Sequence, residues 1–193
     1  AKASDRDALL ARITATGDYG ALSACDLVLE AVFEDPAVKA KVIAAVEAAI
    51  RPDCIFASNT STLPITGLAG ASKRPEQFIG IHFFSPVEKM MLVEVIQGAA
   101  TAAPWLKLAE ALDFVRAIRK PPILVNDGRG FYANRCVGAY LREGHLMLME
   151  GVPPAMIENV ARMAGMPVGP LSLNDEVALD LALRIVRATE KQV

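Results

Sequence analysis

The sequence alternates short apolar runs with stretches of helical length. Five runs have the length and composition of buried strands: residues 26–32, 54–58, 78–82, 91–96 and 121–126. Asp35 and Pro36 supply an N-cap and a first-turn proline for a helix that we expect to reach about residue 50. Thr101 can cap a second helix, whose leucines recur on one side. Strands that alternate with helices predict an α/β fold with a mainly parallel sheet, covered by helices.

The alternation stops after Asn126. The segment Asn126-Asp127-Gly128-Arg129-Gly130 contains two glycines, and only helical patterns follow it. We expect one helix from about residue 131 to 150, a second that ends near 164 after the break at Gly151-Val152-Pro153-Pro154, and a third from 171. The sequence therefore predicts two domains, 1–126 with the sheet and 127–193 with helices only.

Composition narrows the class of protein. The 193 residues are 53% hydrophobic and 22% charged, with a net charge of -2, so the sequence predicts a globular protein without a basic surface for nucleic acid. No apolar run approaches the roughly 18 residues of a membrane span. Three widely spaced cysteines, Cys25, Cys54 and Cys136, favour reduced, buried thiols and a cytoplasmic location.

One glycine motif invites a cofactor interpretation. Residues 128–133 match G-x-G-x-x-A, follow a strand and open a helix, as in a dinucleotide-binding turn. However, the helix leads into Gly151-Val152-Pro153-Pro154 and further helices, so the return strand of a βαβ unit is missing. The favoured interpretation is a glycine hinge between the two domains.

The second motif pairs a histidine with an acid. His82 ends an apolar strand, and Glu94 lies within the apolar run Leu92-Val93-Glu94-Val95-Ile96, where a buried carboxylate needs a partner. The other histidine, His145, has the helical spacing of an edge-of-core residue. Glu30 also follows an apolar run, but solvent or a backbone donor at the strand end can satisfy it. We therefore expect His82 to carry any proton-transfer chemistry.

Three segments of the chain resemble the L-3-hydroxyacyl-CoA dehydrogenases. They are Ser58-Asn59-Thr60-Ser61, then 82–90 with Leu92-Val93-Glu94, and then 130–135. Closing features such as Pro167-Val168-Gly169-Pro170 and 174–177 are similar to the dehydrogenase part of the multifunctional α-subunits of fatty-acid β-oxidation. The resemblance covers nearly the whole chain and implies NAD-dependent oxidation of 3-hydroxyacyl-CoA to 3-oxoacyl-CoA.

The resemblance also implies roles for single residues. His82 would be the general base for the substrate 3-hydroxyl, Glu94 would orient and stabilise its imidazolium, and Ser61 and Asn134 would hold the substrate. The implied cofactor-binding positions are Val32, Phe33, Glu34, Lys39, Ser61 and Ser85. Residues alone leave simpler roles open: a turn residue at Ser61, a helix-surface amide at Asn134, and a solvated pair of Glu34 with Lys39.

The chain departs from the family at its beginning. Members of the family begin with a strand, a G-x-G-x-x-G turn, a helix and an acidic residue for the ribose, and the sequence lacks these. We therefore expect 1–126 to be the later part of an NAD-binding Rossmann-like domain, and 127–193 to begin a substrate or dimerisation domain. This view predicts weak NAD binding and little activity for the isolated chain.

Several alternatives stay open at this stage. A short-chain 3-hydroxybutyryl-CoA dehydrogenase fits the same residues, and so does a non-catalytic scaffold in a β-oxidation complex. The resemblance implies a thiolase subunit as a partner of the parent enzyme and allows a homo-oligomer. It implies no metal site.

Overall fold

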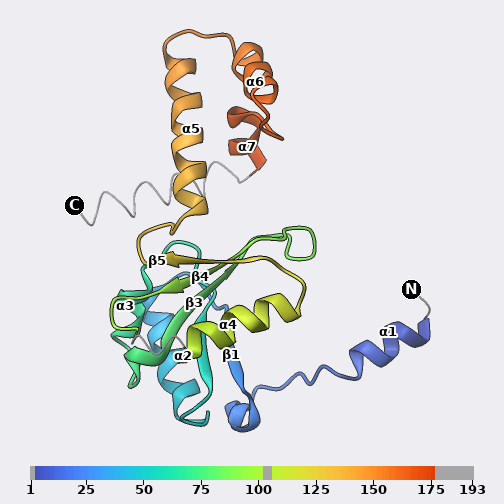
Figure 1. Ribbon diagram of the computed structural model, residues 1–193, viewed down its shortest axis with the longest axis vertical. Helices are drawn as coiled ribbons and strands as arrows, with labels where there is room; N and C mark the ends of the chain where they lie inside the picture. Colours follow the sequence, from blue (N-terminus) through green and yellow to red (C-terminus); the bar gives the residue numbers. More distant parts are fainter. Residues whose placement is uncertain (1–2, 102–105, 177–193) are drawn as a thin grey trace. The chain divides into compact units, whose positions relative to one another are not determined.

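The computed structural model describes residues 3–101 and 106–176 of the chain. The chain divides into two compact units, Ala1–Phe131 and Tyr132–Val193. The first unit holds the sheet, and the described part of the second contains helices only (Figure 1). The fold class predicted from the sequence, an α/β unit followed by an all-helical one, is confirmed.

The sheet has five strands in the order β1-β2-β3-β4-β5. They are β1 Leu27–Glu30, β2 Ile55–Ser58, β3 Phe78–Phe83, β4 Val93–Gln97 and β5 Pro122–Asn126. The pairs β1–β2, β2–β3 and β4–β5 are parallel, whereas β3–β4 is antiparallel. Each of these strands lies within or beside an apolar run of the sequence. Because three of the four pairs are parallel, the predicted mostly parallel sheet is confirmed.

The antiparallel pair has a simple physical cause. Only residues 84–92 connect β3 to β4, and the structure has no helix there. A parallel pair needs a crossover of a dozen or more residues, whereas a short connection returns the chain antiparallel. As a result, residues of β3 and β4 face one another directly, with His82 opposite Glu94.

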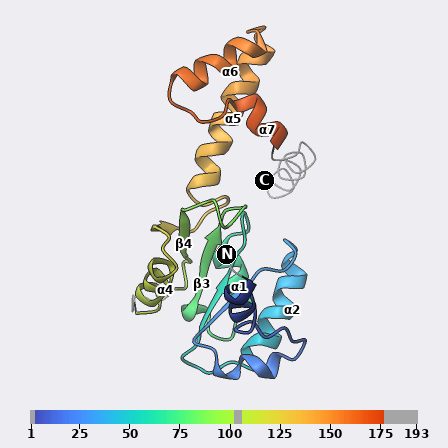
Figure 2. The ribbon, with the colours of Figure 1, turned by 90° about the vertical axis from the view of Figure 1, so that its right-hand side faces the viewer.

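Helices cover both faces of the sheet (Figure 2). On one face, α2 (Pro36–Glu47) and α3 (Ile65–Ala69) contribute to a core that includes Phe56 and Phe78. On the other face, α4 (Leu106–Ala117) packs Ala111 and Val115 against Ile79. Each fully buried large apolar side chain stabilises the fold by roughly 1.5–3 kcal/mol. Packed apolar side chains therefore cover both faces of the sheet.

The predicted helix starts have different outcomes. Asp35 caps α2 as expected, since its Oδ1 accepts hydrogen bonds from the N–H groups of Ala37 and Val38. Thr101 instead uses its hydroxyl within the sheet unit, where it accepts from Gly98 N–H and donates to the carbonyl of Phe78. Residues 102–105, where the start of the second helix was expected, lie outside the described residues.

Three further short elements precede or interrupt the sheet: α1 Ala3–Leu10, η1 Tyr19–Ala24 and η2 Pro75–Gln77.

The helical unit contains α5 Ala133–Met149, α6 Pro154–Met163 and α7 Pro170–Glu176. Glu158 on α6 caps α7, because its carboxylate accepts hydrogen bonds from the N–H groups of Leu171 and Ser172 and from the Ser172 hydroxyl. Gly144 of α5 lies so close to Pro170 that a Cβ atom there would meet its ring at 2.6 Å. The predicted third helix is thus confirmed to Glu176, and its continuation lies outside the described residues.

Candidate active site

His82 and Glu94 form a buried pair across the antiparallel strands. His82 Nδ1 lies 2.7 Å from Glu94 Oε2, and the two side chains are 4% and 0% exposed. The rings of Phe84 and Phe131 lie 4.5 and 5.9 Å from the imidazole, measured between ring centroids. The pair therefore has a largely apolar surrounding, in which charge interactions are stronger than in water.

This geometry suits a general base. A proton on Nδ1 donates to the carboxylate of Glu94, which leaves Nε2 as the ring nitrogen that can accept a proton from a ligand. When Nε2 is protonated, the nearby carboxylate stabilises the resulting imidazolium. The imidazolium in turn lowers the cost of keeping Glu94 charged inside the protein. The pair can therefore take up and return a proton without leaving an isolated buried charge.

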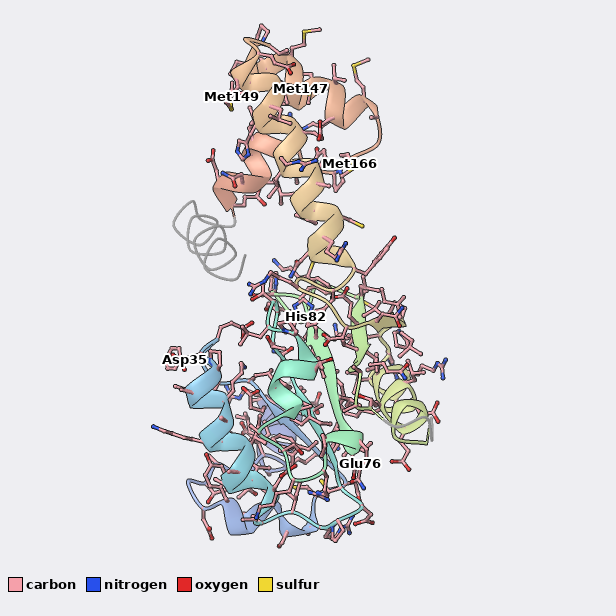
Figure 3. The ribbon with its side chains drawn as sticks, turned by 90° about the vertical axis from the view of Figure 1, so that its left-hand side faces the viewer. Asp35, Glu76, His82, Met147, Met149 and Met166 are labelled. Carbon is pink, nitrogen blue, oxygen red and sulfur yellow. The ribbon has the colours of Figure 1, made fainter. Side chains whose placement is uncertain are left out.

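The strand ends around the pair are fixed by Asn59. Its side-chain Oδ1 accepts a hydrogen bond of 2.9 Å from the N–H of Phe83, the residue after His82. Its own N–H donates to the carbonyl of Glu30, at 2.7 Å. Asn59 thus links the carboxyl ends of three neighbouring strands, β1, β2 and β3. Figure 3 shows His82 and Asp35 toward the same end of the first unit, with Glu76 toward the opposite end.

Glu34 joins the loop after β1 to the loop after β2. Its Oε1 accepts hydrogen bonds from Thr60 Oγ1 (2.6 Å), Ser61 N–H (3.0 Å) and Thr62 N–H (3.1 Å). Burial by itself raises the pKa of Glu34, but these hydrogen bonds and the charge of Lys39 together outweigh it and hold the pKa below its ordinary value. Glu34 is therefore an ionised anchor between two loops at the edge of the sheet.

The expectation of a solvated pair at Lys39 is wrong. Lys39 is 0% exposed, and its ammonium group lies 2.8 Å from Glu30 Oε1 and 3.4 Å from Glu34 Oε2. Glu30 is likewise buried and also accepts from the hydroxyl of Ser58 and the N–H of Val32. The sequence analysis missed Glu30 and Ser58 as partners. The available signal was a carboxylate at the end of an apolar run, followed nine residues later by a lysine in a helix.

The other positions implied by the resemblance lie at the surface of the same unit or in the helical one. Val32, Phe33, Ser61 and Ser85 are exposed, and Phe33 is 84% exposed. Asn134 is half-buried near the start of α5 and belongs to the second unit. The structure thus brings His82, Glu94 and the two edge loops together within the first unit.

The residues at this edge fit the nicotinamide half of NAD. The carboxyl ends of the parallel strands β1 and β2 are where such folds bind nucleotides. The exposed side chains there are an aromatic ring at Phe33, an aliphatic group at Val32 and hydroxyls at Ser61 and Ser85, which suit a planar ring and a ribose. Lys39 is fully buried beneath these exposed side chains.

Other features of the structure bear on the class of protein. Within residues 3–101 and 106–176, no helix combines the length and the apolar composition that crossing a bilayer requires. Helix α5 is followed by α6, so the glycine motif at 128–133 closes no βαβ unit. The cysteines are free thiols. The expectation that all three are buried holds for Cys54 but is wrong for Cys136, which is exposed on α5, and Cys25 is only half-buried. Burial raises the pKa of the Cys54 thiol.

A mostly parallel sheet with a buried histidine–carboxylate pair on its inner strands suits an enzyme that transfers protons, and comparison with known proteins agrees with this. Residues 1–128 match the model of the 3-hydroxyacyl-CoA dehydrogenase NAD binding domain, and 130–193 match that of the C-terminal domain. The chain therefore belongs to the 3-hydroxyacyl-CoA dehydrogenase family, as the resemblance in its sequence indicated.

Solved structures give the same result. The chain is 35% identical to the (S)-3-hydroxybutyryl-CoA dehydrogenase of Ralstonia eutropha, with a TM-score of 0.90 over 100% of this chain and 69% of that one. It is 35% identical to a 3-hydroxybutyryl-CoA dehydrogenase of Escherichia coli, with a TM-score of 0.88 over 94% of this chain and 38% of that one. The dehydrogenase part of multifunctional enzyme 1 from C. elegans is 27% identical, with a TM-score of 0.65 over 98% of this chain and 44% of that one. The chain thus spans between about two fifths and two thirds of the length of these relatives.

Proposed function

We propose that the protein oxidises L-3-hydroxyacyl-CoA to 3-oxoacyl-CoA with NAD as the hydride acceptor. The observation that carries the proposal is the buried pair of His82 and Glu94, 2.7 Å apart, in a domain that matches the NAD-binding model of the family. NAD, when bound, supplies the site that accepts hydride from C3 of the substrate. Val32, Phe33, Ser61 and Ser85 would hold its nicotinamide half.

The residues of this chain supply the proton chemistry. His82 takes the proton of the 3-hydroxyl on Nε2, and Glu94 holds the ring through Nδ1 and stabilises the imidazolium. Ser61 and Asn134 hold the oxygen and the thioester region of the substrate. The phenylalanine rings around His82 limit water, so the proton moves between substrate and base.

The test is the variant His82→Gln in the full-length protein, followed through NADH absorbance with L-3-hydroxyacyl-CoA substrates. We expect kcat to fall by about 10²–10⁴-fold, the usual contribution of a general base, while NADH binding and the thermal midpoint change little. His145→Gln is the matched control, because the second histidine lies in α5 and is expected to leave turnover unchanged. Undiminished turnover of His82→Gln would reject the mechanism. Inactivity of the wild-type protein on every such substrate would favour a scaffold.

Substrate length defines a second candidate. Two of the structural relatives are named as 3-hydroxybutyryl-CoA dehydrogenases, and this favours a short-chain enzyme. The likeness to the dehydrogenase part of a multifunctional enzyme agrees instead with the sequence resemblance to the α-subunits of fatty-acid β-oxidation, which implies a place in that pathway and a thiolase subunit as partner. A series of substrates from 3-hydroxybutyryl-CoA to long-chain 3-hydroxyacyl-CoA separates them, since only a short-chain enzyme predicts that kcat/KM falls steadily as the acyl chain lengthens.

Location and assembly complete the proposal. We place the protein in the cytoplasm, with its free thiols in support, and expect a homo-oligomer. Sedimentation of the purified full-length protein tests the oligomeric state, and a single monomeric species would contradict it.

A further inference from the structure

Lys39 and Glu30 form a fully buried ion pair for which the proposed chemistry has no direct use. The side chains are each 1% exposed, and Lys39 Nζ lies 2.8 Å from Glu30 Oε1. Burying two charges costs several kcal/mol each, and their attraction offsets this only when the remaining donors and acceptors are satisfied. A pair of this kind is weak evidence for stability, so its benefit to the protein must be sought in what it positions.

Three oxygens surround the Lys39 ammonium: two accept hydrogen bonds from it, and the third belongs to an ion-pair partner. They are Glu30 Oε1 at 2.8 Å, the carbonyl oxygen of Val32 at 3.4 Å and Glu34 Oε2 at 3.4 Å. An ammonium group has three N–H bonds and no acceptor. Two of these N–H bonds donate to Glu30 and Val32, and the buried charge is balanced by the carboxylates of Glu30 and Glu34.

The acceptors of Lys39 all belong to β1 or to the loop that follows it. Glu30 in turn accepts from Val32 N–H at 2.7 Å and from Ser58 Oγ at 2.7 Å. Val32 is thus held on both sides, by its carbonyl through Lys39 and by its N–H through Glu30. Ser58 connects the same carboxylate to the end of β2.

The second loop is reached through Glu34. Lys39 attracts one oxygen of its carboxylate, and the other oxygen accepts from the N–H groups of Ser61 and Thr62. One buried ammonium therefore sets the positions of both loops that present Val32, Phe33 and Ser61 at the edge of the sheet. Breaking its pair with Glu30 frees both loops together.

We propose that Lys39 and Glu30 are positioning residues that preorganise the cofactor loops, and that Lys39 does not itself bind the cofactor. This inference rests on the proposed function only in assigning NAD to these loops. It assigns a role to Glu30 and changes the role that the family resemblance implied for Lys39. A preorganised loop loses less entropy on binding, which strengthens the complex without adding a contact.

A pair of variants in the full-length protein separates positioning from direct contact. Lys39→Met leaves the Glu30 carboxylate buried without its cation, whereas Lys39→Met with Glu30→Gln removes both charges. The glutamine oxygen can still accept from Val32 N–H, and its NH₂ group can donate to Ser58. We expect the single variant to raise the NADH dissociation constant about tenfold or more, and the double variant to return within about threefold of wild type.

Hydrogen exchange of the cofactor-free protein gives a readout that does not depend on turnover. We expect faster exchange at the amides of Val32, Ser61 and Thr62 in Lys39→Met, and near wild-type exchange in the double variant. Lys41→Met is the matched control, since Lys41 is exposed on the same helix and its loss should change neither quantity. In turnover, Lys39→Met should raise KM for NAD and the added Glu30→Gln should restore it, a rescue that general destabilisation does not produce.

Two results would overturn the inference. If the double variant binds NADH no better than Lys39→Met, the ammonium contacts the cofactor directly. If Lys39→Met binds NADH as the wild type does, the pair positions nothing that the cofactor uses. If the single variant fails to fold, the double variant alone decides. An NADH dissociation constant well above the expected threefold limit in the folded double variant would then also overturn the inference. NADH binding and exchange need no acyl-CoA, so a failure of the proposed reaction is recognised separately.

Discussion

Replacing Glu94 by glutamine removes a negative charge from a fully buried position and leaves the side-chain volume nearly unchanged. The atoms His82 Nδ1 and Glu94 Oε2 are 2.7 Å apart. At an effective dielectric constant of about 20, the attraction between an imidazolium and a carboxylate at this distance is about 6 kcal/mol. This energy is the upper limit of the stabilisation of the His82 imidazolium that Glu94→Gln can remove.

The lower limit comes from the hydrogen bond that the amide can keep. The glutamine oxygen still accepts from Nδ1–H, and a hydrogen bond to a charged group exceeds a neutral one by about 1–2 kcal/mol. Each 1.4 kcal/mol of lost transition-state stabilisation lowers the rate about tenfold. We therefore expect Glu94→Gln to lower kcat by about 10²-fold, within limits of about 10-fold and 10⁴-fold.

The assay is NADH formation from a saturating L-3-hydroxyacyl-CoA substrate, with KM values for both substrates and a thermal melt of each variant. Glu143→Gln, at an exposed position of α5, is the control for loss of an acidic side chain. We expect both KM values to stay near wild type, because Glu94 acts on the base and not on either ligand. A kcat within about twofold of wild type, in a folded variant, would refute the view that the carboxylate stabilises the imidazolium.

Three further predictions concern the edge loops and the helical unit. At pH values above the ordinary pKa of a glutamate, Glu34→Gln should lower the thermal midpoint, and at pH values well below it the variant should have little effect. The reason is that a pKa lowered in the folded state adds stability that is lost as pH falls. Equal effects in melts at both pH values would contradict this. Asn59→Ala should lower kcat about tenfold and leave NADH affinity unchanged, since Phe83 N–H beside His82 loses its acceptor; calorimetry and turnover measured together test this split. Gly144→Ala should lower the thermal midpoint through its clash with the proline that begins α7, whereas Gly138→Ala on the same helix has open space and should raise it slightly; a rise for both would show that the contact relaxes.

The fold could be predicted from local patterns because the strands are continuous apolar runs and α2 carries a strong start signal. Asp35 and Pro36 define that start in the structure as they do in the sequence. The antiparallel pairing of β3 and β4 was also accessible, since residues 84–92 are too few for a crossover with a helix. Thr101 shows the limit of such signals, because its hydroxyl serves the sheet through Phe78.

Site residues could be predicted from the sequence only where they belong to a recognisable motif, as His82 and Glu94 do. Register makes His82 and Glu94 direct neighbours, and this depends on which residues of β3 and β4 pair, a choice that a one-residue slip would change. The contacts of Glu30 with Lys39 and Ser58 depend on how α2 packs against β1 and how β2 aligns with it. No local pattern encodes these alignments, and so Lys39 was expected in solvent.

Glu30 and Glu94 illustrate why a buried carboxylate in an apolar run does not by itself define a function. Both lie in apolar runs of the sequence, and both are buried near the same edge of the sheet. Glu94 faces a histidine, which can gain and lose a proton within the range in which enzymes work, so the pair can take part in chemistry. Glu30 faces a lysine and also accepts hydrogen bonds from Ser58 and Val32, so that pair lies where it can position the loops around it. The partner that the tertiary structure supplies therefore decides whether such a carboxylate serves proton transfer or the architecture of the loops around it.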